Sequence, residues 1–273
     1  MSTGDTRPIG IFDSGIGGLT VAKAIRQALP AERLLYFGDN AHIPYGDKTN
    51  AEILRLSRGI THALLERGSK LIVIACNTAS AAALKPLREE LPQVVFVGME
   101  PAVKPAVEHT RTGVVGVIAT VATVQGEVFA SIVERFAQDV KVIKQACPGL
   151  VRQIEAGELY TPETEAMLRG WLDPMAEQGI DALVLGCTHY PFVRPLIERI
   201  VGPAVRVIDP APAIARRVEH VLREAGALAT SGHGRLECHT SGDPVLFRSL
   251  METLDVECDA LDAAFWVEDQ LVL

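Results

Sequence analysis

The 273-residue sequence has no excess of basic residues, because 34 acidic residues outnumber 26 lysines and arginines and the formal net charge is −8. It therefore lacks the basic footprint of proteins that bind nucleic acid or anionic membranes. It has no apolar run as long as a membrane-spanning helix requires. Residues 1–8 also lack the apolar core of a signal peptide. We expect a cytoplasmic protein with no nucleic-acid or membrane partner.

Cysteines are few, and they are widely spaced at positions 76, 147, 187, 238 and 258. An odd, scattered set does not suit a disulfide framework, and no Cys-x-x-Cys pair or finger-like spacing indicates a redox or zinc site. The glycine-rich stretch at residues 15–18 lacks the spacing of a dinucleotide-binding or P-loop motif. It is better interpreted as a turn whose backbone N–H groups approach a small anion. We expect no metal and no cofactor.

The sequence does contain two short apolar runs, each of which is followed by a cysteine. Residues 71–75 lead into Cys76-Asn77-Thr78, and residues 182–186 lead into Cys187-Thr188-His189. Such runs are typical of strands buried on both faces of a parallel sheet. Open α/β sheets bind ligands where a strand gives way to a helix, and a helix N-terminus favours a thiolate. We therefore predict functional thiols at Cys76 and Cys187.

The energy needed to ionise these thiols is small. A thiol with the usual pKa of about 8.5 needs roughly 2 kcal/mol to be ionised at neutral pH, and a helix N-terminus supplies about 0.3–2 kcal/mol. One helper group for each cysteine is then sufficient, and Asp13 and His189 are the candidates. A lone buried cysteine is more often a small apolar residue, which is our interpretation of Cys238 and Cys258; Cys147 stays open.

The two halves of the chain also resemble each other. A shift of 111 positions places Cys76 on Cys187 and aligns the preceding strands, and the first strands of the halves differ by a similar shift. We predict two similar doubly wound α/β domains with parallel sheets, related by a pseudo-two-fold axis, with the active site in the cleft between them. The predicted domains are residues 1–98 with 208–273, and residues 99–207. The alternative is that the apolar strands match by chance.

Two details near the C-terminus complete the predicted fold. Residues 236–240 have the pattern of an edge strand. A closing helix from Phe247 is expected to end in an apolar tail over residues 265–273.

A pair of cysteines suits one kind of chemistry better than the alternatives. Hydrolysis by a cysteine uses one nucleophile with a histidine and an oxyanion hole. Two opposed thiols suit removal of a proton from one side of a carbon and delivery of another from the opposite side, which inverts the carbon.

Longer motifs resemble those of bacterial glutamate racemases, which are cofactor-independent members of the aspartate/glutamate racemase superfamily. The resemblance covers nearly the whole chain and rests on residues 9–21, 39–46, 76–80, 100–102 and 186–191. It implies interconversion of L- and D-glutamate, supply of D-glutamate for peptidoglycan, and a homodimer. A racemase of another acidic amino acid, chiefly aspartate, and a non-catalytic two-lobed binding protein are the alternatives.

The resemblance also implies roles for individual residues. Cys76 and Cys187 would be the catalytic acid/bases, assisted by Asp13 and His189, with Glu155 as the acidic partner of that histidine. The implied substrate contacts are Asp13, Ser14, Tyr45, Gly46, Asn77, Thr78, Thr120, Thr123, Thr188 and His189. The chain departs from the family pattern at Gly126 and Phe129, where a serine and a tyrosine are expected.

Overall fold

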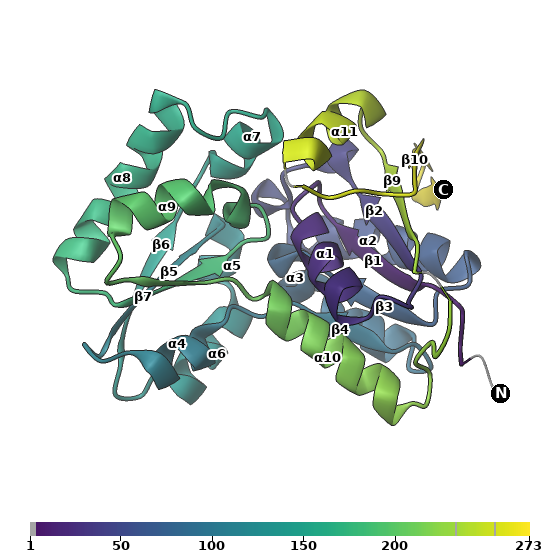
Figure 1. Cartoon of the computed structure of the whole chain (residues 1–273), viewed down its shortest axis with the longest axis horizontal. Helices are drawn as coiled ribbons and strands as arrows, with labels where there is room; N and C mark the ends of the chain where they lie inside the picture. Colours follow the sequence, from purple (N-terminus) through teal and green to yellow (C-terminus); the bar gives the residue numbers. More distant parts are fainter. Residues whose placement is uncertain (1–3, 233, 254) are drawn as a thin grey trace. The chain divides into compact units, whose positions relative to one another are not determined.

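The computed structural model describes residues 4–232, 234–253 and 255–273, and the chain divides into two compact units (Figure 1). Unit 1 comprises Met1–Met99 and Ala211–Leu273, and unit 2 comprises Glu100–Pro210. The boundaries that the sequence suggests, after residues 98 and 207, lie close to these.

Unit 1 is a parallel sheet with helices on both faces (Figure 1). Its strands are β1 (Ile9–Asp13), β2 (Leu34–Gly38), β3 (Leu71–Ile74), β4 (Phe96–Gly98), β9 (Leu236–Thr240) and β10 (Ala260–Ala263), with a separate hairpin of β11 (Phe265–Val267) and β12 (Gln270–Val272). Its helices are α1 (Leu19–Ala28), α2 (Asn50–Glu66), α3 (Asn77–Glu90), α10 (Ala211–Glu224) and α11 (Pro244–Thr253), with short 3₁₀ turns η1 (Asn40–His42) and η2 (Tyr45–Asp47).

The strand order in unit 1 is β10-β9-β2-β1-β3-β4, and every neighbouring pair is parallel. β1 and β3 are buried along their whole length, as strands of a parallel sheet are when helices cover both faces. Helices α2 and α3 pack together on one face and α1 and α10 pack together on the other (Figure 1). The carboxyl ends of β1, β2 and β3 therefore lie side by side at one edge of the sheet.

One prediction about the C-terminal part is wrong. β9 is not an edge strand, because β10 pairs with its outer side. The apolar tail over residues 265–273 forms the antiparallel β11–β12 hairpin, which packs on α2. Leu271 of the hairpin is buried in the same core as Ile60 and Leu64 of α2.

Unit 2 repeats the plan with fewer strands. Its elements are α4 (Val103–His109), β5 (Val114–Ala119), α5 (Val121–Gln125), α6 (Glu127–Phe136), β6 (Lys141–Ala146), α7 (Leu150–Glu155), α8 (Pro162–Glu177), β7 (Ala182–Gly186), η3 (Tyr190–Val193), α9 (Arg194–Val201) and β8 (Arg206–Ile208). All four strands are parallel, in the order β6-β5-β7-β8.

The two sheets share one strand order, because β6-β5-β7-β8 matches β2-β1-β3-β4 strand for strand. β3 and β7, the strands that precede Cys76 and Cys187, occupy corresponding places in this order. The fold is thus the predicted pair of similar parallel-sheet α/β units.

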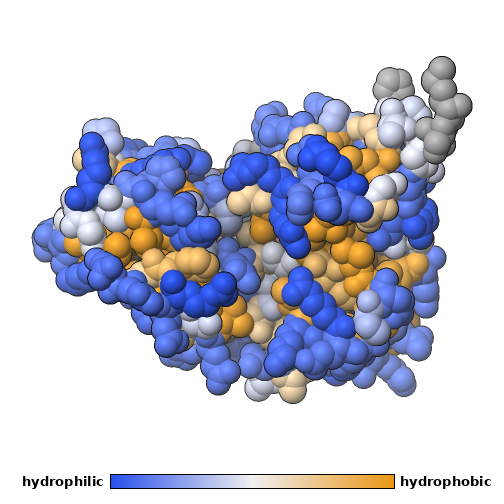
Figure 2. Space-filling model, turned by 90° about the horizontal axis from the view of Figure 1, so that it is seen from below, coloured by the Kyte–Doolittle hydropathy of each residue, from blue (hydrophilic) through white to orange (hydrophobic). Residues whose placement is uncertain are grey.

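Among the described residues, no helix combines the length and apolar character needed to cross a membrane. On the face shown in Figure 2, hydrophilic side chains border the apolar areas.

Candidate functional site

Cys76 lies at the junction that the sequence predicts, between the end of β3 and the first residue of α3. It is the N-cap of that helix, and its Sγ accepts the backbone N–H of Ala79 at 3.4 Å. The thiol also lies 3.8 Å from the Ser14 hydroxyl oxygen, to which it donates. A helix N-terminus with an N–H group directed at the sulfur favours the thiolate, so the local geometry suits an acid/base thiol.

Asp13 and Ser14 reach the same edge of the sheet because β1 is the neighbour of β3. The Asp13 carboxylate is fully buried and accepts the backbone N–H of Gly18 at 2.7 Å. A Cβ on residue 18 would lie 2.6 Å from the Asp13 Cβ and 3.0 Å from the Ala75 Cβ. The glycine-rich turn therefore serves to bring α1 close to this carboxylate, which explains the motif without a nucleotide.

Asn77 and Thr78 form the first turn of α3, directly after Cys76, and both side chains are buried. Within the part of the chain that the structure describes, neither Oδ1 nor Nδ2 of Asn77 has a hydrogen-bond partner. Burial of an unsatisfied amide is costly, and such groups are rare in folded proteins. The Asn77 amide is therefore available to bind a polar ligand beside Cys76.

Tyr45 and Gly46 lie in η2, which packs against α3. The Tyr45 ring is buried, and its hydroxyl donates to Asp39 Oδ2 at 2.7 Å. Burial and then the Asp39 charge raise the tyrosine pKa well above its usual value, with smaller contributions from Cys76 and Asp13. Since the hydroxyl is already engaged, a ligand contact at these two residues would come from their backbone.

In unit 2, Cys187 follows β7, and the structure brings it together with His189 and Glu155 as predicted. The Cys187 Sγ lies 3.8 Å from His189 Nδ1, and His189 Nε2 lies 2.6 Å from Glu155 Oε1, at the end of α7. Burial acts to lower the pKa of His189, but its hydrogen bonds to Cys187 and Glu155 outweigh burial and raise that pKa well above the usual value. The imidazole is therefore placed to exchange a proton with the Cys187 sulfur.

Thr120 and Thr123 lie at the carboxyl end of β5, next to β7 in the sheet. Thr120 is the N-cap of α5, and its hydroxyl accepts the backbone N–H of Thr123 and donates to its hydroxyl. Thr188 is buried directly after Cys187. Hydroxyl groups thus lie just beyond the carboxyl ends of two neighbouring strands, one of which leads to the second thiol.

The two departures from the family pattern lie in unit 2. Gly126 is the N-cap of helix α6, and Phe129 is buried in the core of the unit with Lys144 Nζ 5.5 Å from its ring centroid. The phenylalanine therefore belongs to the packing between α6 and the sheet.

Two further groups near Cys187 were not found from the sequence. Cys147 and Tyr190 are both buried. Burial and then the negative charge on Cys187 raise the pKa of both groups. Cys147 is thus a neutral thiol at neutral pH. Its place after β6, at the same sheet edge as Cys187, was the available signal.

Among the residues that the structure describes, no group of three or more histidine, cysteine, aspartate or glutamate side chains is placed to hold a metal ion.

Comparison with known proteins identifies the family. A model of the Asp/Glu/Hydantoin racemase family matches residues 9–218. The chain belongs to this family. It is similar to a glutamate racemase of Roseiflexus sp. (48% identity over 266 residues, 97% of this chain and 98% of the relative).

Solved structures give the same result. A glutamate racemase from Thermus thermophilus, in complex with β-chloro-D-alanine, has 39% sequence identity and a TM-score of 0.81, covering 97% of this chain and 99% of that one. One from Francisella tularensis, in complex with D-glutamate, has 33% identity and a TM-score of 0.83, covering 95% and 97%. The chain is therefore an isomerase of the racemase type.

Proposed function

We propose that this protein is a glutamate racemase that interconverts L- and D-glutamate without a cofactor. The observation that carries the proposal is the pair of cysteines, each following the corresponding strand of two sheets with the same order. The family membership and the glutamate racemases that resemble the chain support the same substrate.

In the proposed reaction, a thiolate removes the α-proton while the other thiol donates a proton to the opposite face. One S–H bond forms and the other breaks, so the overall charge is unchanged and the roles exchange in the reverse direction. Cys76 and Cys187 are the two acid/bases, with Asp13 assisting the first and the His189–Glu155 pair assisting the second. The mechanism requires both units to contribute to one site, which stays a prediction.

Substrate binding in this proposal relies on neutral groups, since the motifs around both cysteines contain no lysine or arginine. The carboxylates of glutamate are held by backbone N–H groups, by the hydroxyls of Ser14, Thr78 and Thr188, and by the Asn77 amide. The substrate ammonium group remains charged and pairs with Asp13.

The decisive experiment follows the optical activity of L-glutamate incubated with the pure protein. Wild-type protein is expected to remove the signal, and Cys76→Ala and Cys187→Ala are each expected to abolish racemisation. Cys238→Ala, which alters a buried thiol outside the two junctions, is the matched control and retains activity. Full racemase activity in Cys76→Ala or in Cys187→Ala protein would contradict the two-thiol mechanism.

The cofactor-independent reaction has its own test. EDTA and carbonyl-directed reagents such as hydroxylamine are expected to leave activity unchanged. Clear inhibition by EDTA would indicate a metal, and clear inhibition by hydroxylamine would indicate a carbonyl cofactor.

Aspartate is the second candidate substrate, because the family includes aspartate racemases as well as glutamate racemases. Turnover of L-glutamate and L-aspartate measured side by side separates the two. A kcat/KM for aspartate that equals or exceeds the value for glutamate would replace the proposed substrate.

The cellular context is also part of the proposal. The protein acts in the cytoplasm as a homodimer and supplies D-glutamate for peptidoglycan. Light scattering of the pure protein tests the dimer, and a requirement for external D-glutamate after loss of the protein tests the cellular role.

A further inference from the structure

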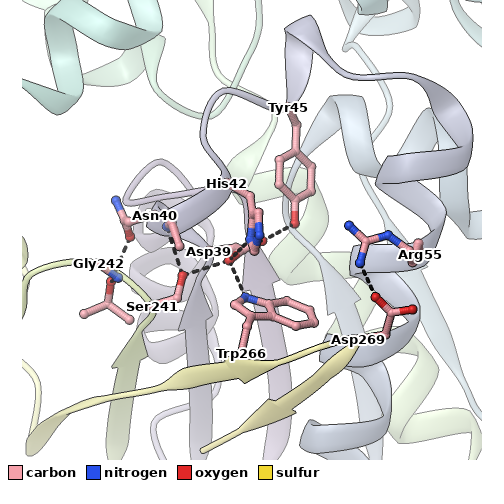
Figure 3. Close-up of polar contacts among 11 residues, drawn as sticks. Asp39, Asn40, His42, Tyr45, Arg55, Ser241, Gly242, Trp266 and Asp269 are labelled. Atoms are coloured by element: carbon pink, nitrogen blue, oxygen red, sulfur yellow. Dashed lines mark hydrogen bonds and ion pairs between the residues drawn. The ribbon is translucent and has the colours of Figure 1, made fainter.

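Asp39 directly follows β2 and carries a fully buried carboxylate that holds together three separate segments of unit 1 (Figure 3). Its Oδ2 accepts the Tyr45 hydroxyl at 2.7 Å, and its Oδ1 accepts the hydroxyl of Ser241 and the indole N–H of Trp266, both at 2.8 Å. The His42 Nδ1 lies 3.0 Å from both oxygens. A buried carboxylate needs such donors, so each of them constrains the others.

One of these segments is the Tyr45 loop, residues 40–47, which contains η1 and η2. The loop packs on α3, the helix that Cys76 caps. Tyr45 and Cys76 belong to the same buried core. The position of the Tyr45 loop therefore decides the shape of the surface beside Cys76.

A second segment is the C-terminal hairpin, more than 200 positions away in the sequence. Trp266 reaches Asp39 from β11, and its ring meets the His42 ring edge-on, with 5.3 Å between centroids. The hairpin rests directly on α2, because a Cβ on Gly59 would lie 2.6 Å from the Asp269 carbonyl oxygen and 2.8 Å from the Trp266 ring. An ion pair between Arg55 and Asp269 adds to this contact (Figure 3).

We propose that the C-terminal hairpin positions the Tyr45 loop, through the Trp266 indole and Asp39, and thereby sets the affinity for substrate beside Cys76. Trp266 acts as a positioning residue that touches no reacting atom. The effect on affinity rests on the proposed function, whereas the effect on the loop does not.

Two variants perturb the hairpin in different ways. Trp266→Phe removes the N–H donor and keeps most of the ring. Gly59→Ala leaves Trp266 intact and pushes the hairpin away from α2. Two controls are matched to them: Phe265→Ala alters an exposed neighbour on the same strand, and Trp171→Phe alters the tryptophan of unit 2.

The first measurement is hydrogen–deuterium exchange of the backbone amides of residues 40–47. Loss of the anchor is expected to speed their exchange about threefold or more in Trp266→Phe and Gly59→Ala, and to leave it unchanged in both controls. This outcome does not depend on the identity of the substrate. Unchanged exchange in both hairpin variants would overturn the proposal.

The second measurement is steady-state racemisation of glutamate. If the loop contributes the same binding free energy to the ground state and to the transition state, its displacement in the hairpin variants should raise KM about fivefold. The kcat should then change less than about twofold. An unchanged KM in folded Trp266→Phe protein would show that the hairpin supports only stability. Failure of wild-type protein to turn over glutamate would instead contradict the proposed function.

A third measurement covers the case in which the hairpin variants do not fold. In Trp171→Phe protein, Trp266 is the remaining tryptophan. Its fluorescence is expected to change as D-glutamate is added and to saturate near the KM. Saturation of the enzyme with no change in emission would overturn the link between the hairpin and the site.

Discussion

Lys70 and Glu32 form an ion pair in which each side chain is only 1% exposed, and removal of one partner should be severely destabilising. The Lys70 Nζ lies 2.7 Å from Glu32 Oε2 and donates to the carbonyl oxygens of Asp5 and Ala227. The other oxygen of Glu32 accepts the backbone N–H of Ala229. The pair thus connects the N-terminal segment, the start of β3 and the chain that follows α10.

Lys70→Met should lower the free energy of unfolding of unit 1 by about 3–5 kcal/mol, because the Glu32 charge is left buried without its partner. Two carbonyl groups also lose their donor. That loss is a large share of the roughly 5–15 kcal/mol that stabilises an ordinary domain. With a urea m-value of about 2 kcal/mol per molar, the midpoint should fall by roughly 2 M.

Tryptophan fluorescence allows the measurement to be made on unit 1 alone. The chain has two tryptophans, Trp171 in α8 of unit 2 and Trp266 in β11 of unit 1. In a Trp171→Phe background, urea unfolding is therefore followed through Trp266. Lys70→Met should move the transition to lower urea in this background.

Two variants make the interpretation specific. Arg58→Met breaks an ion pair with Glu90 of similar length but with side chains 40% and 37% exposed, and it should cost no more than about 1 kcal/mol. Adding Glu32→Gln to Lys70→Met removes the unpaired charge and should restore part of the lost stability. A cost below about 1 kcal/mol for Lys70→Met, equal to that of Arg58→Met, would refute the reasoning.

Three further predictions concern the site and the thiols. Gly18→Ala places a Cβ 2.6 Å from the aspartate that ends β1, and thermal unfolding should show a loss of about 1–3 kcal/mol; unchanged stability would contradict the close approach. Glu155→Gln removes a group that raises the His189 pKa. Because this pKa is higher in the folded than in the unfolded protein, protonation of His189 stabilises the fold fully below the unfolded-state pKa of about 6.5. The stabilisation is lost as the pH rises through the folded-state pKa of His189. The stability difference from wild type should therefore be largest near pH 5–6 and shrink as the pH rises further; a difference that grows with pH would contradict this explanation. The hydrogen bond from Cys238 lowers the pKa of Cys258 to about 7, so iodoacetamide should label Cys258 with a half-maximal rate near pH 7; peptide mapping that finds no label there would refute this.

The sequence predicted the positions of the two thiols because a reactive residue follows a recognisable strand pattern at both places. Cys76 and Cys187 each end an unbroken apolar run, and both lie where such a run predicts, between a strand and the turn or helix that follows. The resemblance to glutamate racemases pointed to Glu155 as the partner of His189, and the two side chains are in contact at 2.6 Å. Their catalytic roles stay a prediction.

The error at β9 and the failure to predict the hairpin have local causes. β10 has the sequence Ala-Leu-Asp-Ala, which shows no strand periodicity, so nothing indicated that β9 would be covered. The β11–β12 hairpin turns at Glu268, which adopts a φ of 53° where asparagine or glycine is usual. A turn without those residues gives no signal in the sequence.

Long-range polar contacts were beyond reach for a different reason. Asp39 was visible only as part of a motif, and its partner Trp266 is 227 positions away. Lys70 and Glu32 look like ordinary surface residues of two loops, and only the packed structure shows that both are buried. Pairing of this kind depends on topology, which a single sequence does not encode locally.

The shared strand order gives the two thiols equivalent positions, yet their neighbours differ: a hydroxyl group beside Cys76, and an imidazole with its carboxylate beside Cys187. L- and D-glutamate have equal free energies in water, so the Haldane relation obliges kcat/KM to be the same in both directions whatever the protein does. The unlike neighbours cannot bias the product. They can only make kcat and KM differ separately between the enantiomers, and each turnover leaves the thiols in the protonation state that suits the return reaction.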